Sequence, residues 1–84
     1  GARPANMTER QQKILSLINK VTKKNETPAL EESLFESGYL DSFALPDLVA
    51  ELEDAFAIQI PDSDLNPRKF DSIERIESYL DQRG

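Results

Sequence analysis

Apolar residues recur at helical spacing in several stretches of the chain, beginning near the N-terminus. At about 100° per residue, one face of the first stretch collects four apolar side chains: Ile14, Leu17, Ile18 and Val21. Thr8 is followed three residues later by Gln11, which is the spacing of a capping box at a helix start. These positions predict a helix from Thr8 to Lys24.

The second stretch is amphipathic, and its polar side is acidic. Five apolar residues share one face of a helix predicted from about Ser42 to Phe56: Leu45, Leu48, Val49, Leu52 and Phe56. Asp47, Glu51 and Asp54 fall on the opposite side and form a stripe of negative charge. Taken alone, this stripe is explained by contact with solvent.

A start signal for the last helix lies at residues 70–74, where Asp71 suits the N-cap and Glu74 follows three residues later. Pro61 favours a short helical turn earlier in the chain, around Ser63 to Asn66. The last helix is predicted to bury a face that holds Ile73, Ile76 and Leu80.

Residues 25–41 form a long predicted loop that is broken by Pro28 and Gly38. Four apolar residues in it indicate that it packs against the helices: Leu30, Leu34, Phe35 and Leu40. The predicted fold is all-α, a small four-helix bundle with three longer helices and one short helix.

The composition restricts the possible chemistry. A chain of 84 residues makes one small domain, and it contains no cysteine and no histidine. Disulfides, thiolate metal sites and catalytic triads are therefore excluded, and we expect no catalytic residue and no metal site.

No apolar run is long enough to cross a bilayer and no signal-peptide core is present, so we expect a soluble, cytoplasmic protein. Residues 1–6 are expected to be a vector remnant or disordered, which leaves residues 7–84 as the domain.

The charge is distributed unevenly along the chain. Residues 1–24 carry a net charge of +5, whereas residues 25–84 carry −11. An acidic body argues against a nucleic-acid partner, because binding to the phosphate backbone requires cationic contacts. Partners with basic patches fit this chain better.

Ser42 stands where the loop turns into the second helix. Asp41 or Ser42 could cap that helix, since both residue types are favoured there. A nucleophilic role is disfavoured, because no histidine or cysteine can activate the hydroxyl and no lysine is near in sequence. The remaining possibility is an attachment point for a phosphoryl-linked group, which spacing alone cannot identify.

A second candidate site follows the second helix. Asp62, Asp64 and Asn66 repeat like the first ligands of an EF-hand calcium loop. The sixth position of that loop requires glycine but holds Pro67, and the twelfth holds Ile73 instead of glutamate. Calcium binding by this motif is therefore disfavoured.

Three segments together resemble the acyl carrier and peptidyl carrier proteins over residues 8–80. LFESGYLDSF (34–43) resembles the attachment motif of that family with its preceding glycine loop, and LVAELEDAFAIQIP (48–61) resembles the second helix. FDSIERIESYL (70–80) is similar to the last helix of the family. The resemblance implies a monomeric carrier rather than an enzyme.

The resemblance also implies a role for Ser42. In the family, a separate phosphopantetheinyl transferase that uses coenzyme A and magnesium attaches phosphopantetheine to the equivalent serine. The thiol of this arm then holds an acyl or aminoacyl group as a thioester for fatty-acid, polyketide or nonribosomal-type synthesis. Asp41 would help the transferase recognise the site. A loading ligase and synthase enzymes with basic patches would dock on five residues: Glu36, Phe43, Asp47, Glu51 and Asp54.

The chain departs from the family pattern at two positions. Phe43 replaces the commoner leucine, a change associated with carriers of the D-alanyl or specialised type. Pro46 lacks an N–H and crowds the carbonyl of Ser42, so we predict a loosened or 3₁₀-like first turn, with regular α-helix from about Pro46. A groove lined by Leu45, Val49 and Ile60 is predicted to hold the carried chain. The alternative function is an unmodified acidic helical interaction module in which Ser42 is only a cap.

Overall fold

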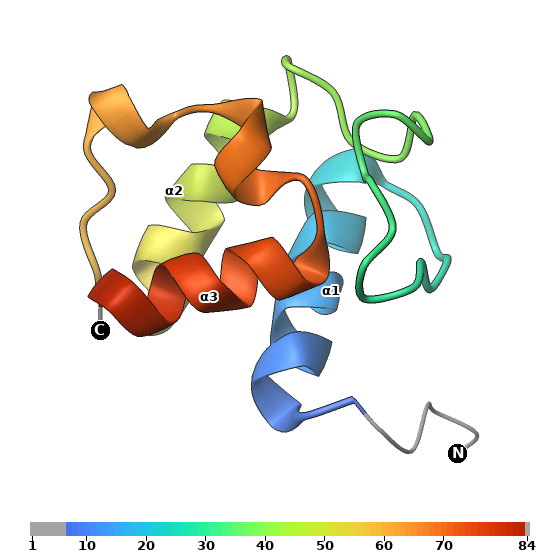
Figure 1. Ribbon diagram of the computed structural model, residues 1–84, viewed down its shortest axis with the longest axis horizontal. Coiled ribbons are helices and arrows are strands. Elements are labelled where there is room, and N and C mark those ends of the chain that lie inside the picture. The colour runs from blue at the N-terminus through green and yellow to red at the C-terminus, as the bar shows by residue number, and fades with distance from the viewer. Residues whose placement is uncertain (1–6, 84) are drawn as a thin grey trace.

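The structure is a computed structural model that describes residues 7–83. The prediction made for residues 1–6 lies outside this range. The described chain contains three α-helices, two 3₁₀ turns and no strand: α1 (Glu9–Thr22), α2 (Leu45–Phe56), η1 (Asp62–Asp64), η2 (Pro67–Phe70) and α3 (Ile73–Arg83). Helix α1 packs against both α2 and α3, and Figure 1 shows α1 nearly vertical and α3 nearly horizontal, so these two helices cross.

The all-helical prediction is confirmed, but a count of four helices is not. The short helix expected around Ser63 to Asn66 is replaced by the two separate 3₁₀ turns. Pro67 explains the interruption, because a residue before proline is pushed into extended conformation. Asn66 has φ −128° and ψ 124°, so the helix cannot continue through it.

Helix α1 begins as the sequence predicts. Thr8 is its N-cap, with its Oγ1 accepting a bond of 3.1 Å from the Gln11 amide, while the Gln11 side chain accepts one of 2.9 Å from the Thr8 amide. The Gln11 side chain also donates a 2.8 Å bond to Glu77 on α3, which joins the two helices. The helix ends at Thr22 because Lys23 adopts the left-handed conformation with φ 59°.

The start of α2 follows the prediction made from Pro46. The amides of Ala44 and Leu45 both donate to the Asp41 carbonyl at 3.1 Å, which makes a tight turn, and the regular helix begins at Leu45. Pro46 lies in the first turn, where a missing N–H leaves no helical bond unmade. The helix predicted from about Ser42 to Phe56 therefore begins three residues later, at Leu45.

The predicted cap of α3 is wrong by one residue. The Ser72 hydroxyl, not Asp71, accepts the capping bond, from the Arg75 amide at 3.1 Å. The Asp71 carboxylate is engaged elsewhere, because it accepts from the Ser33 hydroxyl at 2.8 Å and from the Phe35 amide at 3.3 Å. The local pattern of residues 70–74 could not reveal these partners in a distant loop.

The loop between α1 and α2 packs onto the bundle, as its apolar residues predict. Leu34 and Leu40 are fully buried. The Glu74 amide donates to the Leu30 carbonyl at 3.1 Å, and the Leu34 amide donates to the Asp71 carbonyl at 2.5 Å. These bonds fasten the loop, which forms the right-hand side of the molecule in Figure 1, to the start of α3.

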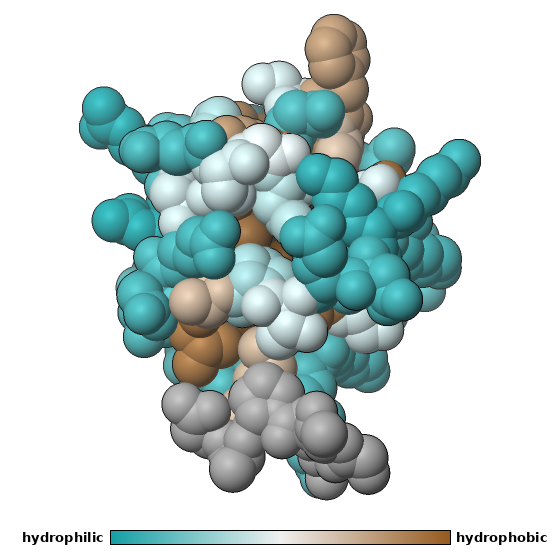
Figure 2. Space-filling view, turned by 90° about the vertical axis from the view of Figure 1, so that its right-hand side faces the viewer, coloured by the Kyte–Doolittle hydropathy of each residue, from teal (hydrophilic) through white to brown (hydrophobic). Residues whose placement is uncertain are grey.

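A single hydrophobic core lies between the three helices. Its largest fully buried side chain is Phe70, whose ring lies 5.2 Å from that of Tyr79 in a tilted arrangement. The predicted face of α3 is buried at Ile73, Ile76 and Leu80. By contrast, the face of the molecule drawn in Figure 2 is mostly hydrophilic, and hydrophobic side chains occupy small, separate areas of it.

Within residues 7–83, every helix is too short or too polar to cross a lipid bilayer.

Candidate attachment site

Ser42 lies exposed in the turn that precedes α2. Its hydroxyl makes no hydrogen bond to any residue between 7 and 83, so it does not cap the helix. Asp41 does not cap α2 either, because its Oδ1 accepts a 2.8 Å bond from the amide of Ala44, which precedes the helix, and thereby closes the turn that holds Ser42. The Ser42 hydroxyl is therefore accessible to another molecule and has no structural bond to lose.

The loop before Ser42 is held in place by the end of α1. Tyr39 is buried, and its hydroxyl lies within hydrogen-bond distance of the Asn19 side chain and the backbone of Glu26. Burial raises the pKa of Tyr39 above its ordinary value. Gly38 supplies the left-handed φ of +81° at which the chain turns back.

Lys24 stabilises the loop before Ser42, a role that the sequence did not indicate. Its ammonium donates a 2.9 Å bond to the Gly38 carbonyl and lies 5.0 Å from the centre of the Tyr39 ring. No motif indicates this contact, because Lys24 precedes the loop and reaches its partners only after the chain has folded back. The cation steadies the turn that leads to Ser42.

Phe43 projects into solvent immediately after Ser42. Its side chain is 91% exposed, and it is the one large hydrophobic residue in the described chain that is exposed. An exposed phenyl ring gains nothing from burial within this molecule. Its role in contacting a partner remains a prediction.

The structure separates the predicted docking acids into two groups. Glu36, Asp47 and Asp54 are exposed and make no ion pair with residues 7–83. Glu51 is half-buried, and its carboxylate lies 3.1 Å from the ammonium of Lys20 on α1. Glu51 is thus partly neutralised within the molecule, whereas the other three carboxylates remain available.

The groove predicted beside α2 is closed in this conformation. Leu45, Val49 and Ile60 are each only 5% exposed and belong to the hydrophobic core. Sequence periodicity correctly placed Leu45 and Val49 on the inner face of the helix, but it could not show whether that face is open. The groove remains a prediction, and it would form only if these three side chains moved out of the core.

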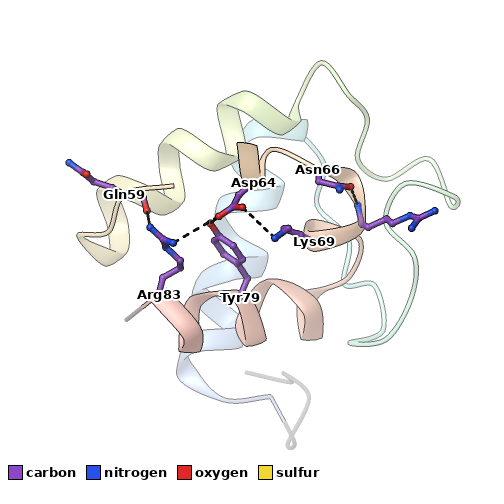
Figure 3. Close-up of polar contacts among 7 residues, drawn as sticks. Gln59, Asp64, Asn66, Lys69, Tyr79 and Arg83 are labelled. Carbon is purple, nitrogen blue, oxygen red and sulfur yellow. Dashed lines mark hydrogen bonds and ion pairs between the residues drawn. The ribbon is translucent and has the colours of Figure 1, made fainter. Parts of the chain in front are cut away.

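The residues that resemble a calcium loop serve a structural contact. Asp64 accepts a 2.6 Å bond from the Tyr79 hydroxyl and a 3.3 Å bond from Lys69, as Figure 3 shows. The Asn66 side chain accepts from the Arg68 amide at 2.9 Å. No cluster of three or more acidic residues suited to a metal occurs between residues 7 and 83. This geometry gives the calcium interpretation no support.

The contact between Asp64 and Tyr79 shifts the pKa of both residues. The hydrogen bond from Tyr79 is the main cause that lowers the pKa of Asp64, and Lys69 and Arg83 act in the same direction. Burial, followed by the hydrogen bond to Asp64, raises the pKa of Tyr79 to about 12. The contact is therefore strongest with Asp64 ionised and Tyr79 protonated.

A phosphopantetheine group fits the residues around Ser42. Its attachment requires one free hydroxyl that a transferase can reach, and the exposed, unbonded Ser42 side chain meets this requirement. A thiol at the end of such an arm would also supply chemistry that a chain without cysteine lacks.

Comparison with known proteins identifies the class. The family model described as a phosphopantetheine attachment site matches residues 12–80, so this chain belongs to that family of carrier proteins. Phosphopantetheine, held covalently, is the prosthetic group of this domain.

Curated relatives point to one branch of the family. The chain is similar to a D-alanyl carrier protein of Lactobacillus acidophilus, with 26% identity over 70 residues that cover 83% of this chain and 89% of the relative. It is 31% identical to a D-alanyl carrier protein of Streptococcus suis over 65 residues, which cover 77% of this chain and 82% of the relative. A D-alanyl carrier protein of Leuconostoc citreum is 27% identical over 73 residues, covering 82% and 94%.

Proposed function

We propose that this protein carries an activated D-alanyl group as a thioester on a phosphopantetheine arm attached to Ser42. One observation supports the attachment point above all others: the Ser42 hydroxyl is exposed and unbonded within the segment that matches the family. The names of the relatives support the D-alanyl group. This proposal is narrower than the fatty-acid, polyketide or nonribosomal setting expected from the resemblance.

In this proposal the chain itself performs no catalysis. A transferase joins the Ser42 oxygen to the phosphorus of the phosphopantetheine half of coenzyme A; the pyrophosphate bond of coenzyme A breaks, adenosine 3′,5′-bisphosphate leaves, and the hydroxyl proton is released. Asp41 serves in recognition. Asp41 suits this role because its bond to the Ala44 amide fixes the turn on which Ser42 is presented. The arm supplies the thiol that bears the aminoacyl group, and the folded domain supplies the surface that partner enzymes recognise.

The docking surface in this proposal comprises residues from the loop before Ser42, from the turn that holds it and from α2. Phe43 offers an apolar contact, while Asp47, Asp54 and Glu36 offer free carboxylates to a ligase or acceptor enzyme with a basic patch. Complementary charge of this kind mainly accelerates association. Glu51 contributes less, because Lys20 already neutralises part of its charge.

The attachment is tested by incubating the protein with coenzyme A, Mg²⁺ and a promiscuous phosphopantetheinyl transferase, followed by intact-mass measurement. The wild type should gain the mass of phosphopantetheine, and Ser42→Ala should not. Ser63→Ala is a matched control, since Ser63 is also exposed. A wild-type protein that gains no mass would favour the unmodified interaction module.

The carried group is tested on the modified protein with a D-alanine-activating ligase and ATP. D-Alanine should add to the arm as a hydroxylamine-sensitive thioester, and L-alanine should add much more slowly. Efficient loading of fatty acyl groups in place of D-alanine would refute the substrate while leaving the attachment intact.

A further inference from the structure

A cavity of about 300 Å³ opens beside Ser42, between the end of α1 and the start of α2. Asp41, Phe43 and Ala44, which flank Ser42 in the chain, form one side of it. The rest of the wall comes from the end of α1, the glycine turn and the first turn of α2: Val21, Thr22, Lys24, Gly38, Tyr39 and Asp47.

The wall of this cavity combines three kinds of group. Val21 and Phe43 provide apolar surface, and Lys24 is the one cation among the lining residues. Asp41 and Asp47 add carboxylates that make no ion pair within residues 7–83, and Asp41 accepts a bond from the Ala44 amide. Its volume lies at the lower end of the ~300–1,000 Å³ typical of small-molecule sites, and its wall is more polar than the wall of most such sites.

We propose that the phosphopantetheine arm on Ser42 rests in this cavity. The inference depends on the proposed attachment to Ser42. The chemistry of the arm matches the wall: its phosphate is an anion for Lys24, its geminal methyl groups suit Val21 and Phe43, and its amide N–H groups can donate to Asp47. The cavity also begins at the residues on either side of the attachment point, so the arm can reach it at once.

This resting place differs from the groove predicted beside α2. That groove would require Leu45, Val49 and Ile60 to leave the core, where they are almost fully buried. The cavity near Lys24 is already open. It also shares Phe43 and Asp47 with the proposed docking surface, so a partner that binds these two residues displaces the arm and exposes its thiol.

The test compares the unmodified and the phosphopantetheinylated protein by NMR, after intact mass has verified complete modification. The geminal methyl protons of the arm should show nuclear Overhauser contacts to the methyl groups of Val21 and to the Tyr39 ring. The amides of Val21 and Thr22, which are remote from Ser42 in sequence, should shift on modification.

Two single-charge variants sharpen the result. Lys24→Gln should lose most of the shift changes at Val21, while Lys23→Gln, which removes the same charge from an exposed neighbour outside the cavity, should retain them. Because Lys24 also steadies the loop, Asp47→Asn provides a second test at an exposed residue without an ion pair. It should weaken the same contacts with only a small loss of thermal stability, because Asp47 lies in the first turn of α2, where a negative charge favours the helix.

The outcomes separate this inference from the function on which it rests. No mass gain refutes the attachment and the resting place together. A mass gain with shift changes confined to residues 41–44 refutes the resting place alone, because it shows a free arm. Contacts from the arm to Val49 or Ile60 also refute it and favour the groove beside α2.

Discussion

The hydroxyl of Tyr79 donates a 2.6 Å hydrogen bond to the carboxylate of Asp64. This contact joins η1 to α3, and Figure 3 shows Lys69 and Arg83 approaching the same carboxylate from either side. Tyr79 is buried and also packs against Phe70 at the centre of the core. One side chain thus fixes the segment between α2 and α3 by both a polar and an apolar contact.

The Tyr79 contact predicts a loss of stability at high pH. Because folding raises the pKa of Tyr79 from 10.0 to about 12, the folded state holds its proton more tightly than the unfolded state. The resulting stabilisation is complete below pH 10.0 and is lost as the pH rises to about 12. Chemical unfolding at a series of pH values should show this decline in the wild type but a smaller one in Tyr79→Phe. Equal declines would contradict the assignment.

Asp71 is predicted to secure the long loop. Asp71→Ala removes the acceptor of bonds from Ser33 and Phe35, and it should lower the free energy of unfolding by about 1–3 kcal/mol. The control is Asp54→Ala, an exposed acid without an ion pair, which should change stability by less than about 0.5 kcal/mol. Urea unfolding measures both, and equal losses for the two variants would show that the Asp71 bonds contribute nothing specific.

Much of this fold is predictable from the sequence because its helices carry strong local signals. The box of Thr8 and Gln11 sets the start of α1, and Pro46 forces a separate turn before α2. The predicted cap of α3 at Asp71 is wrong, because the Asp71 carboxylate accepts bonds from Ser33 and Phe35, which lie far away in the chain. A local sequence pattern shows which secondary structure a residue favours. It does not show which distant residue will bond to its side chain in the folded protein.

The candidate site also combines residues that the sequence indicates with residues that only the fold brings in. Ser42, Asp41 and Phe43 are adjacent in a recognisable motif, so the sequence indicated them together. Lys24 belongs to the site only because the loop folds back on α1, and no sequence spacing encodes that contact. Sequence periodicity also cannot show whether the inner face of α2 is open, because this depends on packing. In the structure Val49 is buried and the predicted groove is closed.

The turn before α2 predicts a pattern of amide exchange. The Phe43 amide should exchange rapidly, because it makes no backbone bond to residues 7–83, while the Leu48 amide should be protected by its 2.9 Å bond to Ala44. Hydrogen–deuterium exchange followed by NMR resolves the two positions. Strong protection at Phe43 would mean that the helix begins earlier than Leu45.

The charge distribution predicts that salt stabilises the protein. Residues 25–84 carry a net charge of −11, so the folded body experiences self-repulsion that dissolved ions screen. The melting temperature should therefore rise when NaCl is increased from low concentration, and Mg²⁺ should act at lower concentration than Na⁺. A constant or falling melting temperature would refute this prediction.

The central claim, that Ser42 bears the prosthetic group, is tested most directly by peptide mapping of the modified protein. After treatment with coenzyme A, Mg²⁺ and a transferase, proteolysis and fragmentation mass spectrometry locate the added mass along the chain. The account predicts that all of it lies on Ser42. Addition to Ser37 or another residue, or no addition at all, would contradict the account.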